Sequence, residues 1–520
     1  MATSLDQKHQ DEEMFRPPLA RGMKALDRSI FQKVVSINAA RVFDNKNISK
    51  VRSQLERSKD ALQQDRIANV LPDPDAERAK VGKKCILLRP EVRQSDLNTH
   101  DATNGVNGDT IKHSTQDERT TAWPHSPVLA ELVKEELISV IPYNLHLNYD
   151  YWTYHDIITA ILPIEAQSEI PSGFSQVGHV VHMNLRDAYL PYKYLIATII
   201  IDKNPGAKTV INKIDDVGEE NEFRTFKYEV LAGKDDLNVA VSEAGCEFHF
   251  DYSKVYWNTR LSTEHARLVD MFKEGEAVCD VMAGIGPFAV PAGKKRVFVW
   301  ANDLNPDSYA SLTDAVSRNK VGDFVTPSCS DGRKFIREAA AQLLAEEKVV
   351  EIKRKVSRRE AQAQAQTNGN PVSHGPVKKV VRPKTFQHYV LNLPASALTF
   401  LPSFVGLYPS ELRDKLPPGT AMPMVHVYCF STKDELATGT HSAGTDTENE
   451  QKLMTTNETA EQKICSEISK HLGYEMVPGT HAEDQRPGAV QIWDVRDVAP
   501  KKRMFCASFR LPEEVAFRHP

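Results

Sequence analysis

Four short glycine-rich or polar motifs each follow an apolar run in the second half of the chain. Residues 280–288 (DVMAGIGPF) carry Gly284 and Gly286 directly after a run with the composition of a buried strand. Because glycine lacks a Cβ, the backbone of such a turn can approach a ligand closely. The later motifs bring polar side chains to the ends of three further runs: Asp303, Asp331 and Asn392. Ligands of doubly wound sheets bind at the carboxyl ends of strands, so these side chains are candidate ligand contacts.

The polar strand ends suit an adenosyl ligand that carries no phosphates. A carboxylate at Asp303 can accept hydrogen bonds from both hydroxyls of a ribose. A pyrophosphate loop would favour a third glycine, but the chain has Ala289 there and no Gly-Lys-Ser/Thr sequence. Asp331 can accept from an adenine amino group, and Asn392 would lie beside a reactive methyl group. S-adenosylmethionine therefore fits best, although each side chain taken alone also suits a capped turn.

The elements that must position these residues alternate between strand and helix. From residue 277 to 332 the order is strand, helix, strand, helix, strand, which predicts a parallel sheet. The sheet resumes at residues 388–394 and 424–430. Residues 503–510 follow a helix and could return as an antiparallel edge strand. The fold class predicted for this part is α/β.

The preceding sequence predicts two smaller α+β units. The run at residues 194–201 (YLIATIII) is too short to span a bilayer, so we interpret it as a buried strand. The expected segments are a first unit at 1–95, a linker at 96–124, a second unit at 125–233 and a C-terminal domain at 234–520. Polar insertions are expected near 345–384 and 436–460. The first insertion is rich in Lys and Arg, which favours a solvated, disordered segment, with an RNA-contacting arm as the alternative.

Composition limits the class of protein. The chain has 520 residues, 41% hydrophobic and 26% charged, with a net charge of −5. These values are typical of a soluble protein with more than one core. The seven cysteines are scattered and form no Cys-x-x-Cys pair, so we expect no metal cluster and no disulfide framework. The acidic first residues do not resemble a secretory signal or a transit peptide.

The combined motifs resemble those of the eukaryotic and archaeal tRNA guanine-N1 methyltransferases that act at position 37. The resemblance covers about residues 14 to 510, apart from the polar insertions. It is carried by DVMAGIGPF at 280–288, ANDLNP at 301–306, SDG at 330–332, NLP at 392–394, IPSGFSQVGH at 170–179, NLRD at 184–187, DKNPG at 202–206 and VYWN at 255–258. It implies a Rossmann-like class I methyltransferase domain at the C-terminal side, preceded by two smaller α+β units that bind tRNA.

The resemblance also implies roles for individual residues. Glu264 would be the general base for the proton on N1, and Arg224 would stabilise the charge that moves to O6. Asn392 and Pro394 would shape the methyl-transfer pocket. S-adenosylmethionine would contact His265, Asp280, Gly284, Gly286, Asp303, Leu304, Asp331, Gly332 and Asn392. His265 stands where some archaeal relatives have Arg.

Simpler interpretations exist for the two catalytic candidates. Ser262 or Thr263 could cap a helix, which would put Glu264 in its first turn, where a negative charge is favourable in any protein. Arg224 could be an ordinary surface residue of a strand.

The implied partner is tRNA with guanine at position 37, bound by a monomer without contact to a membrane. Candidate phosphate contacts are Arg186, Lys193, Lys203 and Lys213, each of which could also be an ordinary surface cation. Relatives act in the cytoplasm, the nucleus and the mitochondrial matrix. Two alternatives remain open: the related wybutosine-pathway transferase of an aminocarboxypropyl group, and a non-catalytic protein that binds tRNA or adenosylmethionine.

Overall fold

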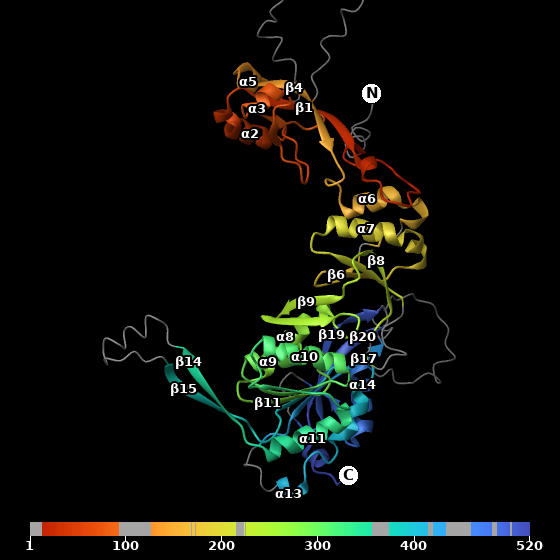
Figure 1. The fold of residues 1–520 in the computed structure, drawn as a ribbon, viewed down its shortest axis with the longest axis vertical. Helices are drawn as coiled ribbons and strands as arrows, with labels where there is room; N and C mark the ends of the chain where they lie inside the picture. Colours follow the sequence, from red (N-terminus) through yellow and green to blue (C-terminus); the bar gives the residue numbers. More distant parts are fainter. Residues whose placement is uncertain are drawn as a thin grey trace, which may run out of the picture. The chain divides into compact units, whose positions relative to one another are not determined.

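The computed structural model divides the chain into two compact units (Figure 1). One unit comprises Met1–Gly173 and Leu185–Pro205, and the other comprises Phe174–Asn184 and Gly206–Pro520. The described residues are 13–92, 126–167, 169–171, 173–214, 223, 225–355, 374–413, 420–432, 459–480, 486–499 and 502–519. The expected linker at 96–124 lies outside them, as does nearly all of the insertion near 436–460. The units interleave along the sequence, and the segment limits expected from composition stay a prediction.

The first unit is built on an antiparallel sheet with the strand order β2-β3-β1-β4. Its elements are β1 (Lys33–Val42), α2 (Ile48–Arg57), β2 (Val70–Pro72), β3 (Lys84–Leu87), α5 (Pro127–Lys134) and β4 (Ile138–Leu147). Val51 and Leu55 lie four residues apart on one face of α2, and they pack with Leu129 and Leu132 of α5. Two amphipathic helices and the sheet therefore share one core.

The apolar run at 194–201 forms a helix, so its assignment as a strand was wrong. It belongs to α7 (Lys193–Lys203), which contacts α6 (Tyr154–Ile161). α7 buries Leu195, Ile196, Ala197, Ile199 and Ile200. A helix buried on most sides shows no helical period in its apolar residues, and composition alone then cannot separate it from a strand. No helix in the described part of the chain has the length and apolar character needed to cross a membrane.

The second unit contains an eight-stranded sheet with the order β13-β12-β11-β16-β17-β20-β19-β18. Its strands are β11 (Ala277–Asp280), β12 (Phe298–Asn302), β13 (Val325–Ser328), β16 (His388–Leu391), β17 (Met424–Thr432), β18 (Val477–Pro478), β19 (Ala489–Ala499) and β20 (Lys502–Arg510). The five strands from β13 to β17 pair in parallel. The predicted parallel sheet is confirmed, and the chain crosses over beside β11, where the order reverses.

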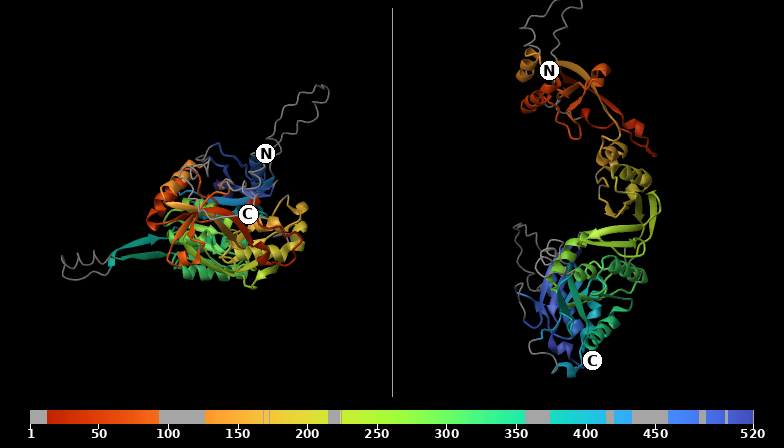
Figure 2. Two further views of the ribbon diagram at one scale, coloured as in Figure 1. Left: turned by 90° about the horizontal axis from the view of Figure 1, so that it is seen from above. Right: turned by 60° about the vertical axis from the view of Figure 1, so that its left-hand side comes forward.

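Helices cover both faces of this sheet (Figures 1 and 2). One face carries α8 (Ser262–Met271), α9 (Ala289–Lys294) and α10 (Pro306–Arg318), and the other carries α11 (Gly332–Ala345), η6 (Ala397–Phe404) and α14 (Ala460–Leu472). Val278 packs in the first of these cores and Cys279 in the second. Neighbouring residues of a strand point to opposite faces, so a short, fully buried strand supplies both.

The C-terminal strands differ in part from the prediction. β20 pairs antiparallel with β17, as expected, and α14 lies between them in sequence. β20 is not an edge strand, however, because β19 pairs with its other side and β18 follows β19. β19 mixes apolar and charged residues without regular alternation, and half of it is exposed, so its sequence gives no clear strand signal.

The basic insertion contains a regular hairpin. β14 (Val349–Lys355) pairs antiparallel with β15 (His374–Val381), while residues 356–373 lie outside the described part of the chain. Its expected disorder is therefore wrong for the two strands. Lys378 and Lys379 pair with Glu274 and Glu351. The hairpin lies between α11 and the start of β16, so it emerges at the amino-terminal edge of the parallel strands, and contact with RNA stays a prediction.

Two smaller sheets complete the second unit. They are formed by β5 (Ser175–Val177), β6 (Val180–Met183), β7 (Thr209–Lys213) and β8 (Tyr228–Gly233), and by the ribbon of β9 (Asn238–Glu243) and β10 (Cys246–Asp251). Val180, Phe248 and Phe250 share the core of α8, α9 and α10. The ribbon thereby reaches the N-terminal end of α8, where the site residues begin.

Candidate active site

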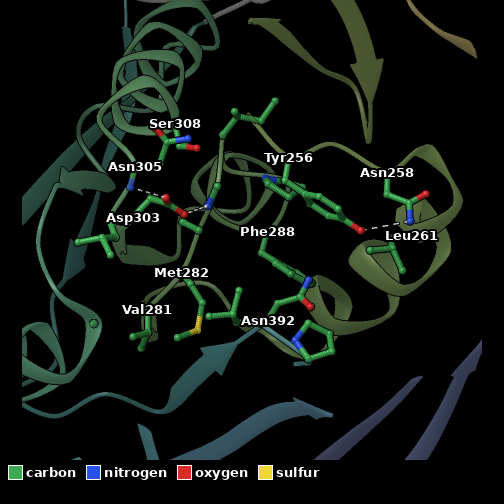
Figure 3. A pocket seen from close by; sticks show the side chains of 18 of the residues that line it. Tyr256, Asn258, Leu261, Val281, Met282, Phe288, Asp303, Asn305, Ser308 and Asn392 are labelled. Atoms are coloured by element: carbon green, nitrogen blue, oxygen red, sulfur yellow. Dashed lines mark hydrogen bonds between the residues drawn. The ribbon is translucent and has the colours of Figure 1, made fainter. Parts of the chain in front are cut away.

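A cavity of about 370 Å³ lies at the carboxyl ends of the parallel strands (Figure 3). Eight of the residues predicted from the sequence line it: His265, Gly284, Asp303, Leu304, Asp331, Gly332, Asn392 and Pro394. They come from α8 and from the segments that follow β11, β12, β13 and β16. The expected meeting of the strand ends is confirmed. Gly286, Asp280 and Glu264 are not among the lining residues, and Arg224 lies outside the described part of the chain.

The turn requires glycine at positions 284 and 286 for different structural reasons. Gly284 has φ +56°, and a Cβ built on it would meet no atom within 4 Å. Gly286 has φ +98°, and its Cβ would lie 2.6 Å from Leu312 Cδ1 and 2.9 Å from Val290 Cγ2. Gly284 therefore leaves open space in the cavity for a ligand, whereas Gly286 allows the turn to pack closely on α9 and α10.

Asp303 is held by backbone donors. Its Oδ2 accepts from Gly284 N at 2.8 Å and its Oδ1 from Asn305 N at 2.9 Å, as Figure 3 shows. Burial raises the pKa of Asp303, and these two hydrogen bonds act in the opposite direction. A carboxylate has about four acceptor sites, so both oxygens can still accept from a diol.

Asp331 caps a helix and also lines the cavity. Its Oδ1 accepts from Arg333 N at 2.8 Å and from Lys334 N at 3.3 Å at the start of α11. The capped-turn interpretation and the ligand interpretation are therefore compatible for this residue. Asn302 ties the neighbouring strand ends together, because its Nδ2 donates to Val281 O at 3.1 Å and to Ser330 O at 2.9 Å.

Asp280 ends β11 behind the turn and is fully buried. Neither of its carboxylate oxygens has a hydrogen-bond partner among the described residues. Burial and the neighbouring carboxylate of Asp303 raise the pKa of Asp280. A positively charged ligand at the turn would offset the cost of ionising these two acids. A sulfonium or ammonium group fits this environment, and a pyrophosphate does not.

His265 is fixed between a carboxylate and an aromatic ring. Its Nδ1 lies 2.6 Å from Glu243 Oε1 of β9, and its ring meets Phe288 edge to face at 4.8 Å.

The expected helix cap is wrong: Ser262 is already helical, and neither its side chain nor that of Thr263 caps α8. The turn Thr259–Leu261 runs directly into α8, and Asn258 caps that turn by accepting from Arg260 N at 3.1 Å.

Glu264 does not line the cavity, and its buried carboxylate forms an ion pair with the partly exposed Arg267. Arg267 donates to both of its oxygens, from Nη2 to Oε1 at 2.6 Å and from Nε to Oε2 at 2.7 Å. The hydroxyl of Tyr428 donates to Oε1 at 2.7 Å. Burial would lower the pKa of Arg267, but its contact with Glu264 raises it overall, so the guanidinium stays charged.

The remaining wall of the cavity was not predicted as site residues. It includes Phe223, Tyr256, Trp257, Asn258, Phe430, Arg496, Val498 and Met504. The VYWN motif was a usable signal for three of these, since it places two aromatic rings and an amide directly before α8. Arg496 and Val498 belong to β19, a strand without a sequence signal, and could not have been assigned.

The four candidate phosphate contacts lie in varied surroundings. Arg186 pairs with Glu169, Lys203 donates to Tyr149 O at 2.6 Å, and Lys193 lies over the Tyr194 ring. Lys213 lies 4.1 Å from the centre of the Phe226 ring, and burial lowers its pKa. A binding role for any of them stays a prediction. No cluster of His, Cys, Asp or Glu suited to a metal ion occurs among the described residues.

Comparisons with known proteins give the family. A model of the TYW2 N-terminal domain matches residues 154–236, and a model of the TRM5/TYW2 methyltransferase domain matches residues 239–357. Among solved structures, Trm5b from Pyrococcus abyssi is 18% identical with a TM-score of 0.50, over 92% of this chain and 99% of that one. The complex of aTrm5 with tRNALeu gives 16% identity and a TM-score of 0.51, over 91% and 99% of the two chains. These two neighbours share the fold.

Curated relatives match over nearly the whole length. A tRNA (guanine(37)-N(1))-methyltransferase of Neurospora crassa is 48% identical over 98% of this chain and 96% of its own. Those of Aspergillus fumigatus and Schizosaccharomyces pombe are 48% and 39% identical, over 97% and 96% of this chain and 96% of each of theirs. The chain belongs to the family of the tRNA (guanine(37)-N(1))-methyltransferases.

Proposed function

We propose that this protein transfers a methyl group from S-adenosyl-L-methionine to N1 of guanine 37 in tRNA, next to the anticodon. The observation that carries the proposal is the cavity at the strand ends, lined by the predicted motif residues in a chain whose relatives share this activity along its full length. The Trm5 neighbour bound to tRNALeu supports tRNA as the substrate.

The cavity fits the cofactor in chemistry. When bound, S-adenosylmethionine supplies an electron-poor methyl group, whose bonding pair remains on sulfur when the methyl leaves. Asp303 would hold the ribose hydroxyls, Asp331 the adenine amino group, and Gly284 would leave room for close approach. Burial raises the pKa of both Asp280 and Asp303, and a positively charged ligand beside them would favour their ionised forms. Asn392 and Pro394, at the end of β16, would shape the space between cofactor and target base.

The proton chemistry is assigned to Glu264 and Arg224. N1 of guanine carries a proton that must leave as the methyl arrives. Glu264 would take it: the N1–H bond breaks, an O–H bond forms on the carboxylate, and the nitrogen pair bonds the methyl carbon. Arg224, proposed from its sequence motif, would balance the charge that moves to O6. Such a base contributes about 10²–10⁴-fold in rate, and such a donor contributes about 10²–10³-fold.

The target base must leave the anticodon loop to enter the cavity. Unstacking a loop nucleotide costs less than opening a duplex, and enzymes that modify bases commonly extrude them. Tyr256 and Phe430 in the wall of the cavity offer rings against which a flipped guanine could stack. We also propose that the protein acts as a monomer in the cytoplasm and nucleus, and that a share of it acts in the mitochondrial matrix. Light scattering and imaging of a tagged chain would test these points.

One experiment separates the candidate reactions. The purified protein is incubated with S-adenosylmethionine and tRNA transcripts that carry guanine, inosine or adenine at position 37. We expect methylation with guanine, identified as 1-methylguanine after digestion, and none with adenine at that position. The rival aminocarboxypropyl transfer would add a much larger mass to the tRNA, and a non-catalytic protein would leave the transcript unchanged. The full-length matches to methyltransferases do not favour either alternative.

A further inference from the structure

The carboxylate of Glu264 is surrounded by hydrogen-bond donors although it is buried. Only 6% of the residue is exposed, and three donors reach its two oxygens within 2.7 Å. Two of these come from Arg267, three residues later on α8, and one from Tyr428, far along the sequence on β17. An ionised carboxylate is costly to bury unless it is paired and hydrogen-bonded, and this arrangement provides both.

Tyr428, which contacts Glu264, lies two residues along β17 from a residue that lines the cavity. In the register of β17 and β20, Phe430 is opposite Met504 and Tyr428 is opposite Cys506. Phe430 and Met504 line the cavity, whereas Tyr428 and Cys506 do not. Two residues along a strand correspond to about 6.6 Å. Glu264 also lies between two lining residues of its own segment, Leu261 and His265. Its carboxylate is therefore adjacent to the cavity and can turn toward it by rotation of its side chain.

Among the described groups around Glu264, Arg267 carries the positive charge that can stabilise its carboxylate. Burial raises the pKa of Tyr428 and raises that of Cys506 to about 11, so both are neutral at physiological pH. Burial also lowers the pKa of His426, which lies near Arg267. The Trp493 ring of β19 lies 5.0 Å from Arg267 Cζ and covers the guanidinium. Arg267 is thus the single cation in contact with the carboxylate among the described residues.

We propose that Arg267 and Tyr428 are positioning residues for the general base, which hold the carboxylate of Glu264 by three hydrogen bonds beside the cavity until the target guanine arrives. The proposal rests on the role of Glu264 under the proposed function. A buried carboxylate without these donors would take up a proton from solvent at a higher pH and could then no longer accept the one on N1. When Glu264 turns and accepts that proton, the guanidinium of Arg267 keeps its cation–π contact with the Trp493 ring.

The test is the pH profile of the single-turnover methylation rate in Arg267→Met. Methionine keeps an unbranched apolar side chain but removes the charge and both hydrogen bonds. We expect the rising acidic limb to move up by about 1–2 pH units, which lowers the rate on that limb by about 10–100-fold. The rate should recover at alkaline pH, and the affinities for S-adenosylmethionine and tRNA should stay at the wild-type level.

Two further variants keep the test decisive. Tyr428→Phe preserves the buried ring and should move the limb in the same direction by a smaller amount, even if Arg267→Met folds poorly. Arg267→Lys keeps the positive charge, so its acidic limb should lie between those of the wild type and Arg267→Met. The matched control is Arg318→Met, which breaks an exposed ion pair with Asp314 on α10 and should leave the profile unchanged.

Three results would count against the proposal, and each differs from failure of the proposed base. An equal loss of rate at every pH in Arg267→Met would mean a purely structural ion pair, and an unmoved limb in Tyr428→Phe would exclude the hydroxyl. If Glu264→Gln keeps the wild-type single-turnover rate, Glu264 is not the base, whatever Arg267→Met does. If Glu264→Gln loses the rate while Arg267→Met keeps the wild-type profile, the base stands and only the positioning role fails.

Discussion

Alanine at Gly284 should mainly weaken cofactor binding, whereas alanine at Gly286 should mainly destabilise the fold, although both positions belong to one turn. At Gly284, φ +56° is a left-handed conformation that a side chain can adopt at a cost of roughly 1–2 kcal/mol, and the new methyl group meets no protein atom within 4 Å. That methyl would instead stand in the cavity. Gly284→Ala should therefore fold with a modest loss of stability and bind S-adenosylmethionine at least about tenfold more weakly, which corresponds to about 1.4 kcal/mol.

At Gly286 the cost falls on the fold. There φ is +98°, and the new Cβ would overlap Leu312 at 2.6 Å and Val290 at 2.9 Å, both fully buried. Backbone strain and overpacking each cost roughly 1–3 kcal/mol, and Val290 is stiff because it is branched at Cβ. Gly286→Ala should therefore lose roughly 2–6 kcal/mol of folding stability, more than Gly284→Ala.

The assay for this pair combines chemical denaturation with titration calorimetry. Denaturation of each variant without cofactor gives the stability difference, and calorimetry on the folded fraction gives the affinity for S-adenosylmethionine. Wild-type affinity in Gly284→Ala would refute the close approach of the ligand to this turn. Equal stability of the two variants would refute the packing argument for Gly286.

Three further predictions concern the site and the buried histidines. Glu264→Gln should bind S-adenosylmethionine normally and lose about 10²–10⁴-fold in single-turnover rate, and a rate within a few-fold of wild type would contradict the base assignment. Asp303→Ala should weaken S-adenosylmethionine binding in calorimetry without changing tRNA affinity in filter binding; an unchanged cofactor affinity would exclude the ribose contact. Burial lowers the pKa of His426 in the folded state, so protonation favours unfolding: stability should be level above the unfolded value of about 6.5 and fall as the pH drops below it, by about 1.4 kcal/mol per pH unit. In His426→Asn this fall should flatten, and an identical slope in denaturation series at several pH values would assign the acid sensitivity elsewhere.

The cofactor half of the site could be predicted from the sequence because its signals are local. A glycine turn, an acid or an amide directly after an apolar run specifies both the strand end and the ligand group, and parallel strands bring such ends together. The helix α7 was predicted wrongly because burial on most sides removes the helical period from its apolar residues. The strand β19 was not predicted because its exposed half has no strand pattern. The contact of Glu264 with Tyr428 joins residues 164 positions apart, and nothing in either local sequence indicates it.

The antiparallel end of the sheet, where β19 was not predicted from the sequence and β17 and β20 were, is the part that we expect to distinguish this enzyme from others with the same cofactor. The segments that follow the parallel strands β11, β12, β13 and β16 line the part of the cavity where we propose that the cofactor binds. Any enzyme that binds the same donor needs a similar wall. The opposite wall comes from β17, β20 and β19, where the sheet changes from parallel to antiparallel pairing. The same three strands carry Tyr428, Cys506 and Trp493 around the Glu264–Arg267 pair. Under the proposed function, the residues that would accept the target base and those that would hold the general base lie on the same strands, so a change in this antiparallel end should alter the chemical step while cofactor binding persists.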